Sequence, residues 1–589
     1  MVEKNPTQPE VGPLTVSVVV RSTNEPVATV NLYYRKMFER DTMLPMNDDG
    51  IEGDAVASDG VWTAVIPGKA FAPGEMTRWR FVATDLDGTA TKEPAYRARL
   101  DSHKYFGTVA LDSRIRSFLP VLHWFTRNVS AAGSSGGSRG ALYYNGEFYD
   151  NVFFRRHGQS SAGFPKKSYN IDFNRTQRFS WNENAPRVAD IDLITNWADK
   201  SKVRHVLAYE VMRESGVAAH FAHTVRVQHN GGFFSTADLV EDADETYLER
   251  AGLNTDGALY KIYANSLNKD SGNNATTGVE KKTRRFENNA DLQSLINGLD
   301  LRGQALVNYL YDNIDIPRCV NLLAANSVIR NIDMHRKNWY IYRDTGQSGE
   351  WAILPWDLDL SHGRTWNTQN TYFDNRLYTK GFVVSGTRIR LVSHMFANPA
   401  IRAMIMRRIR TLTDRFLQPL PTPGTPETEL YYERRLNEQS QLIDPSAIVP
   451  SDARLDFEKW GSWLQRGATV RHTSANSDVE TMAEAIERWK TEYLPARRRY
   501  IYNTQIVGRG GEIPLPQTGG GPTTSYFHLV ANGATSKVLV PTNGKLGTTW
   551  TGSPSLEPFD TTGWLSGPTG VGYDLSLIHI SEPTRPLYI

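Results

Sequence analysis

The chain has 589 residues, which corresponds to about three or four domains of ordinary size. Its 66 basic residues nearly balance its 64 acidic ones, so no overall charge would draw it onto nucleic acid or an anionic membrane. With 46 glycines and 30 prolines it is neither collagen-like nor of low complexity, and no apolar run approaches the roughly 20 residues of a membrane-spanning helix. The single cysteine, Cys319, excludes an intrachain disulfide, and its apolar neighbours predict that it is buried.

The N-terminal part of the chain carries the pattern of β-strands. Partly alternating runs rich in β-branched residues occur at 14–21, 28–34, 60–66 and 77–84. Turns rich in Asp, Gly and Pro separate these runs at the spacing of a β-sandwich. We therefore predict that residues 1–112 form an immunoglobulin-like β-sandwich.

One loop of this predicted sandwich, residues 47–60, contains four aspartates: Asp48, Asp49, Asp54 and Asp59. Clustered carboxylates are the ligands that Ca²⁺ prefers, but their spacing is not that of an EF-hand. Asp-Gly pairs also form ordinary turns. We favour a turn, with a Ca²⁺ site as the alternative.

Residues 113–505 predict a single α+β domain. Strand patterns dominate at 140–173 and 224–262, and helical periodicity follows them. The predicted helices are 290–299, 304–313, 318–330, 401–416, 431–442 and 479–500. A strand-rich half followed by a helix-rich half predicts two lobes with a cleft between them.

The C-terminal part is less regular. Residues 506–525 are rich in Gly and Pro, which is typical of a linker. Residues 526–574 return to strand patterns and resemble the opening of a jelly-roll-like β-sandwich module that is too short to be complete. Residues 575–589 resemble a translated sequencing adapter at the end of an environmental contig, so we exclude them from the fold prediction and expect a truncated C-terminus.

The most informative segment begins at residue 330. Asp333 and Asn338 are separated by four residues and precede an aromatic-rich strand pattern, and Asp357 and Asp359 follow the next strand pattern. Protein kinases use an Asp, an Asn after four intervening residues and a later Asp to orient the substrate hydroxyl and to hold Mg²⁺. The same residues are also typical of capped turns at strand ends, and their spacing alone leaves both interpretations open.

A loop of small residues lies earlier in the same predicted domain. Gly158, Ser160 and Ser161 would let backbone N–H groups approach phosphate oxygens, and Lys166 or Lys167 ahead of the next strand would pair with them. The loop has neither a Walker A sequence nor GxGxxG, so it does not identify a nucleotide site by itself.

Together these segments resemble the spore-coat protein H (CotH) kinase family, an atypical protein-kinase-like group, over residues 118–500. The matching segments are Leu119-Pro-Val-Leu-His-Trp-Phe125, residues 158–173 and 197–211, Asn230-Gly231 ahead of Glu241, and Pro355-Trp-Asp-Leu-Asp359. Gln159 stands where the family usually has Asn. Ser235 and Ala237 replace a usual Gly and an aromatic residue, which puts the adenine side of the site in doubt.

The resemblance implies a two-lobed, protein-kinase-like fold and roles for several residues on the nucleotide side. Lys167 would bind phosphate, with Lys166 as the second choice. Arg204 would contact phosphate or cap the acidic loop. Glu210 would be the ion-pair partner of the lysine or lie on a solvated helix face, and Glu241 would be the hinge residue.

For the chemistry itself, the resemblance implies that Asp333 is the catalytic base. Asn338 and Asp357 would be Mg²⁺ ligands, and Asp359 a further ligand or a structural acceptor. All three positions that define the base and the metal, Asp333, Asn338 and Asp357, match the family, which argues against a degraded site.

Two functions follow as hypotheses. The first is a protein kinase that uses ATP and Mg²⁺, or Mn²⁺, to phosphorylate Ser or Thr of a surface or coat protein, including itself. The second is a non-catalytic surface scaffold or adhesion protein with a structural kinase-like domain.

The N-terminus lacks the apolar stretch of a signal peptide. We expect an exported or cell-surface protein whose signal peptide lies outside this sequence, with a cytoplasmic protein as the alternative.

Overall fold

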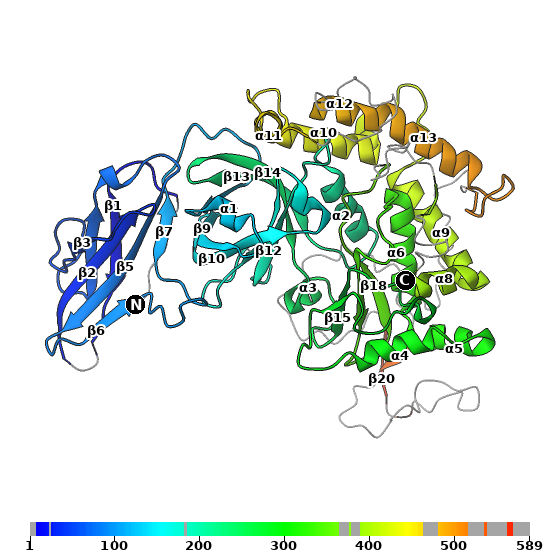
Figure 1. Ribbon diagram of the computed structural model, residues 1–589, viewed down its shortest axis with the longest axis horizontal. Coiled ribbons are helices and arrows are strands. Elements are labelled where there is room, and N and C mark those ends of the chain that lie inside the picture. The colour runs from blue at the N-terminus through cyan, green and yellow to red at the C-terminus, as the bar shows by residue number, and fades with distance from the viewer. Residues whose placement is uncertain are drawn as a thin grey trace. The chain divides into compact units, whose positions relative to one another are not determined.

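The computed structural model describes residues 8–22, 25–181, 185–363, 376–378, 389–462, 481–515, 535–538, 562 and 564–568 (Figure 1). It divides into two compact units, residues 1–516 and 517–589, so the chain is multidomain. In the second unit the strands β19 (Thr535–Val538) and β20 (Leu565–Pro568) pair antiparallel. The rest of the predicted jelly-roll-like module and all of residues 575–589 lie outside the described residues.

The N-terminal strands form two sheets around a common core. Strands β1 (Leu14–Val19) and β4 (Val61–Ile66) pair antiparallel. The second sheet has the order β3 (Thr42–Pro45), β2 (Val27–Lys36), β5 (Met76–Asp85) and β6 (Ala90–Glu93), and β7 (Phe106–Val109) pairs with β5. The turn between the sheets includes the 3₁₀ helix η1 (Gly68–Ala70). Buried and less buried residues alternate along β1 and β5, as the predicted period of two requires, and all four predicted strands are present.

The acidic loop at 47–60 uses its carboxylates to bind its own backbone. Asp48 accepts hydrogen bonds from the amides of Asp59 and Gly60 over 3.1 and 3.0 Å, and Asp54 accepts one from the amide of Gly50 over 2.7 Å. These are the side-chain-to-backbone bonds of Asp-rich turns. The alternative of a Ca²⁺ site stays a prediction.

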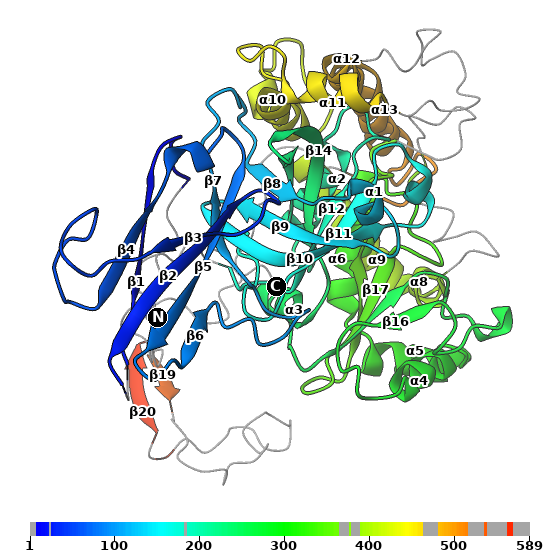
Figure 2. The ribbon, with the colours of Figure 1, turned by 60° about the vertical axis from the view of Figure 1, so that its left-hand side comes forward.

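The next seven strands close into a barrel in the order β10–β11–β12–β14–β13–β8–β9 (Figure 2). Their bounds are β8 (Val121–Phe125), β9 (Ser138–Tyr144), β10 (Glu147–His157), β11 (Ser168–Asp172), β12 (Asp190–Ile194), β13 (Ala222–His229) and β14 (Gly232–Glu241). Strands β13 and β8 run parallel, and the other neighbours run antiparallel. The rings of Trp124, Phe154 and Tyr169 pack edge to face in the barrel core. The strand patterns at 140–173 and 224–262 predicted most of these strands, but not β8, β12 or the closure of the sheet.

A small apolar cluster joins the sandwich to the barrel. Met76 and Val109 of the sandwich pack with Phe125, Tyr143 and Phe148 of the barrel. Gly107 on β7 is needed for this contact, because a Cβ there would lie 2.6 Å from the Phe148 ring. A polar contact adds to it, since Asp150 accepts hydrogen bonds from the amides of Lys104 and Tyr105 at 3.0 Å each and from Arg78 at 3.3 Å.

A second sheet, with the order β16 (Val279–Lys281), β15 (Ala258–Ile262), β17 (Trp339–Arg343) and β18 (Trp351–Pro355), lies among the helices. The α-helices are α1 (Val129–Ala132), α2 (Arg204–Glu214), α3 (Glu245–Arg250), α4 (Ala290–Gly298), α5 (Gly303–Asn313), α6 (Ile316–Ile329), α8 (Arg390–Ala397), α9 (Pro399–Phe416), α10 (Tyr431–Ile443), α11 (Asp452–Trp460), α12 (Met482–Arg488) and α13 (Leu494–Arg499). Short 3₁₀ helices are η2 (Ser160–Gly163), η3 (Lys269–Ser271) and η4 (Glu427–Glu429), and π-turns η6 (Trp489–Tyr493) and η7 (Tyr500–Thr504) flank α13.

The six predicted helices are all present, and the last of them is interrupted by the π-turn η6. Helix α6 packs against α9 and β18, and its Cys319 is fully buried, as predicted.

The first half of the predicted linker contacts α9, where Arg410 donates a hydrogen bond to the carbonyl of Pro514 over 2.9 Å. No described helix is both long and apolar enough to cross a membrane.

Candidate functional site

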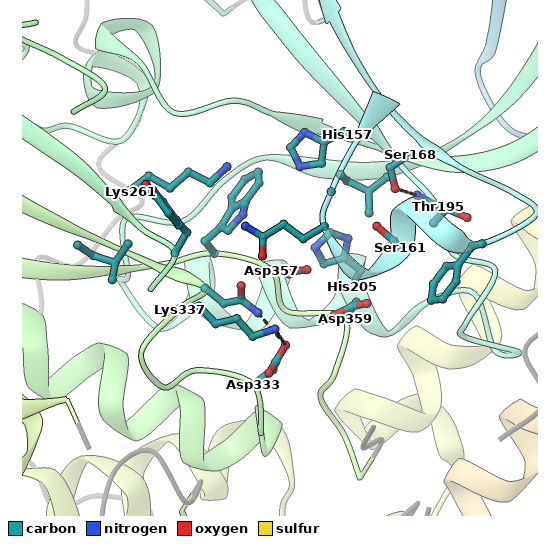
Figure 3. Close-up of a pocket in the computed structure, with 18 of the residues that line it drawn as sticks. His157, Ser161, Ser168, Thr195, His205, Lys261, Asp333, Lys337, Asp357 and Asp359 are labelled. Carbon is teal, nitrogen blue, oxygen red and sulfur yellow. Dashed lines mark hydrogen bonds and ion pairs between the residues drawn. The ribbon is translucent and has the colours of Figure 1, made fainter. Parts of the chain in front are cut away.

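A cavity of about 400 Å³ is lined by the barrel on one side and by the second sheet and its loops on the other (Figure 3). Its wall contains eight acidic or basic side chains: His157, His205, Lys261, Glu280, Asp333, Lys337, Asp357 and Asp359. Asn338 lines it as well, and so do Gly158, Gln159 and Ser161 of the small-residue loop. The cavity therefore unites three segments that are far apart in the sequence.

Asp333 lies in the loop that follows α6, at the bottom of the view in Figure 3, and is mostly buried. Asn338 donates a hydrogen bond to its Oδ2 over 2.8 Å, and the Lys337 ammonium lies 3.1 Å from the same oxygen. His335 Nε2 lies 3.2 Å from the other oxygen. Asn338 has a φ of +65°, a left-handed conformation that Asn tolerates better than most residues. The turn thus fixes the orientation of the Asp333 carboxylate.

Asp357 lies two residues after the end of β18 and also has a positive φ, +56°. Its amide donates a hydrogen bond to the hydroxyl of Tyr209 over 3.2 Å. Within the described part of the chain, no side chain donates a hydrogen bond to its carboxylate. Burial raises the pKa of Asp357, and the nearby charge of Asp333 raises it further. The carboxylate is therefore an acceptor that the surrounding protein leaves without a matching donor.

Two histidines complete the barrel side of the cavity, and each faces a buried carboxylate. His157 Nδ1 lies 3.1 Å from Asp192, which is fully buried, and His205 Nδ1 lies 3.6 Å from Asp238. Burial acts to lower the pKa of His205, but the charge of Asp238 and those of the two cavity carboxylates outweigh it, so that this pKa is raised. His205, which lies on α2, is therefore favoured in its charged form near Asp357 and Asp359.

The two lysines predicted to bind phosphate do not line the cavity in the described structure. Lys167 donates hydrogen bonds to the carbonyls of Ala162 and Phe164, over 2.9 and 3.3 Å. Lys166 is buried behind the wall and contacts Asn196 and Asp456. The basic side chains that line the described cavity are those of His157, His205, Lys261 and Lys337. Lys261 Nζ lies 4.6 Å from the centre of the Trp356 ring.

The small-residue loop contributes backbone to the cavity. Gly158 has a φ of +86°, and a Cβ there would lie 2.3 Å from the Ser161 hydroxyl, so the position requires glycine. Ser160 and Ser161 begin the short 3₁₀ helix η2. Gly158 and Ser161 therefore lie where the sequence predicted the phosphate loop.

Three other predicted residues lie away from this cavity. Arg204 is fully buried in an ion pair with Asp199. Glu210 accepts hydrogen bonds from Arg435 and Tyr431 of α10, each over 2.7 Å, and contacts neither lysine. Glu241 pairs with Arg250 over 2.8 Å, and burial raises its pKa. The helix and strand that carry these residues were predicted, but the direction of each side chain depends on packing between distant elements.

Sequence reasoning missed His157, His205, Lys261 and Lys337 as cavity residues. His205 and Lys337 lie within the segments already singled out, but nothing in a single sequence marks them as facing the cavity. They come from β10, α2, β15 and the loop after α6, so their direction depends on how these separate elements pack together.

Most of this site lies within a region that matches a known family. Residues 154–420 match the family model described as CotH kinase protein. The chain is also similar to the inner spore coat protein H of Bacillus subtilis (strain 168), with 27% identity over 216 residues, which are 35% of this chain and 58% of that protein. The chain thus spans somewhat more than half the length of this relative. A match to a solved structure, a cycloalternan-degrading enzyme from Trueperella pyogenes, covers 26% of this chain and 17% of that enzyme. The two sequences are 16% identical there, and the TM-score is 0.13.

Proposed function

We propose that this chain is a protein kinase of the CotH family, which transfers a phosphoryl group from ATP to Ser or Thr hydroxyls, since residues 154–420 match the family model described as CotH kinase protein. The observation that supports this most is the convergence of Asp333, Asn338, Asp357 and Asp359 on one cavity. We also propose that the barrel and the helical part act as the two lobes of a kinase-like domain, and that the N-terminal sandwich is immunoglobulin-like.

The donor set of the cavity fits Mg²⁺, or Mn²⁺, which prefers oxygen ligands. Asn338 turns its NH₂ group toward Asp333, because a carboxylate only accepts, and so leaves its Oδ1 for a cation. The Asp357 carboxylate has no hydrogen-bond donor among the described side chains. Asn338 and Asp357 would hold the metal, with Asp359 beside them, and the bound ion would neutralise charge on the phosphates of ATP.

The remaining chemistry belongs to the residues of the chain. Asp333 would accept the proton of the substrate hydroxyl, and the hydrogen bond from Asn338 would keep its oxygens in place. The backbone of Gly158 and Ser161 would approach the phosphates, while His157, His205 and Lys261 would offset their charge. Phosphoryl transfer depends mainly on such positioning and charge neutralisation.

The substrate would be a protein with accessible Ser or Thr, at a cell surface or in a coat. This location is supported by the similarity to a spore coat protein of Bacillus subtilis. One observation favours the second candidate, a non-catalytic scaffold: neither Lys166 nor Lys167 reaches the described cavity.

The deciding experiment uses the full chain. We expect wild-type protein to bind ATP only with Mg²⁺ or Mn²⁺ and to transfer radiolabelled phosphate to itself or to a Ser/Thr-rich peptide. Binding without transfer by any divalent cation would favour the scaffold, and absence of nucleotide binding would refute the kinase proposal.

A further inference from the structure

Lys166 forms a fully buried ion pair with a carboxylate from a distant part of the chain. Its Nζ lies 2.7 and 2.8 Å from the two carboxylate oxygens of Asp456 on α11. Lys166 is 1% exposed and Asp456 is 0% exposed. Because two buried charges lose their hydration, such a pair persists only where the surroundings satisfy both partners. Asp456 lies beyond the residues that match the family model.

Helix α11 is attached to the end of the barrel along its whole length. Asp452 in its first turn pairs with Arg226 over 2.8 Å, and the Trp460 indole at its end donates to the carbonyl of Phe234 over 2.6 Å. Asp456 lies between these anchors. There it accepts a hydrogen bond from the amide of Thr236 over 2.8 Å and another from Lys202.

The buried pair is connected to the cavity by polar contacts. Lys166 donates to Asn196 Oδ1 over 2.6 Å, and the Asn196 amide faces Asp238, the partner of His205, at 3.4 Å. The neighbours of these residues, Ser168 and Thr195, line the cavity and are joined by a 3.0 Å hydrogen bond. A shift of Lys166 would therefore move the cavity wall.

We propose that Asp456 is a positioning residue for phosphoryl transfer, which holds the Lys166 ammonium behind the phosphate side of the cavity wall. This inference rests on the proposed kinase function and extends the site to α11. It also replaces Glu210 as the partner of the lysine, since Glu210 is engaged with α10.

The protonation of Lys166 depends on this contact. Burial lowers the pKa of Lys166 to about 7, and the charge of Asp456 opposes that effect. The charge of Lys202, which shares Asp456, lowers this pKa as well, and the charge of Asp238 raises it. Loss of the carboxylate would lower the pKa further and leave an uncharged amine near neutral pH.

The test compares Asp456→Asn with Asp452→Asn, a matched control on the same helix that also breaks a buried ion pair but lies away from the cavity. We expect both variants to lose similar thermal stability. We expect transfer by Asp456→Asn to fall by about tenfold or more, with an altered pH profile, and transfer by Asp452→Asn to stay within about twofold of wild type. Equal losses of transfer in the two variants would refute the inference.

Two further measurements keep the test decisive. In a double-mutant cycle, Lys166→Gln with Asp456→Asn should transfer no less than Lys166→Gln alone, because the two residues act as one pair. This comparison also serves if Asp456→Asn alone does not fold. The pKa of Lys166, followed by NMR of the full chain labelled with ¹³C at lysine Cε, should fall in Asp456→Asn, and an unchanged pKa would refute the inference without reference to activity. A wild type that binds no ATP would refute the kinase proposal instead.

Discussion

Asn338 and Asp333 are joined by a 2.8 Å hydrogen bond that fixes the amide of one and the carboxylate of the other. The bond spans a turn in which Asn338 adopts a left-handed conformation. Because of this bond, the two ends of the Asn338 amide have different roles. The NH₂ group orients the proposed base, and the amide oxygen is free to face the cavity.

This division predicts the behaviour of Asp333→Asn. The variant keeps the shape of the side chain and an oxygen that accepts the Asn338 hydrogen bond, but it cannot take up a proton. We expect nearly normal ATP binding and a loss of transfer of about 100-fold or more, as for a general base. Isothermal titration with ATP and Mg²⁺ and the phosphate-transfer assay measure the two effects. Equal transfer by the variant and the wild type would contradict the assignment of Asp333.

Asp357→Asn should raise the stability of the metal-free protein and weaken its binding of Mg²⁺. The pKa of Asp357 is raised in the folded protein, so ionising it costs stability as the pH rises through that folded pKa. In metal-free buffer the variant should therefore melt higher than wild type at neutral pH, by an amount on the order of a few °C. The gain should vanish below the unfolded carboxyl pKa of about 4.

The same variant tests the metal site. Mg²⁺ should raise the melting temperature of the wild type, because a ligand of the folded state stabilises it, and should do so much less for Asp357→Asn. Melting curves at several pH values with and without Mg²⁺ give both answers. A variant that melts lower at neutral pH and still responds to Mg²⁺ would show that Asp357 is a structural acceptor.

Glu210→Gln should affect stability alone. Glu210 forms a two-pronged contact with Arg435 and accepts from Tyr431, so the loss of its charge leaves the α10 guanidinium without its full partner. We expect a cost of about 1–3 kcal/mol in the free energy of unfolding and an unchanged KM for ATP. A raised KM at unchanged stability would instead restore Glu210 as a partner of the phosphate site.

Gly107→Val tests whether the sandwich and the barrel fold as one body. A Cβ at Gly107 would lie within 3 Å of the Phe148 ring, and its φ is not in the left-handed region, so the substitution tests space alone. Overpacking of this kind costs about 1–3 kcal/mol. Gly12→Ala is the control in the same sandwich, because no atom lies within 4 Å of its added Cβ. If both variants melt like wild type, the apolar cluster that joins the sandwich to the barrel is not tightly packed.

Local sequence determined the elements of this protein. The periodicity of apolar residues placed the strands at 14–21 and 77–84 and helices such as 318–330, because each period reflects which side chains face a core. The spacing of Asp333, Asn338 and Asp357 also predicted the central residues of the candidate site, since a turn and two adjoining strands place these residues together. Each of these inferences depends on contacts between near neighbours in the chain.

Only the tertiary structure decided which side chains meet across the fold. Lys166 and Lys167 are adjacent and chemically alike, and successive residues of an extended chain point to opposite sides. In the folded chain Lys166 is buried, and its partner Asp456 lies on α11, 290 residues further along the sequence. Glu210 is likewise paired with Arg435 of α10. A single sequence carries no signal for such pairs, because their energy depends on burial that exists only after distant elements have packed together.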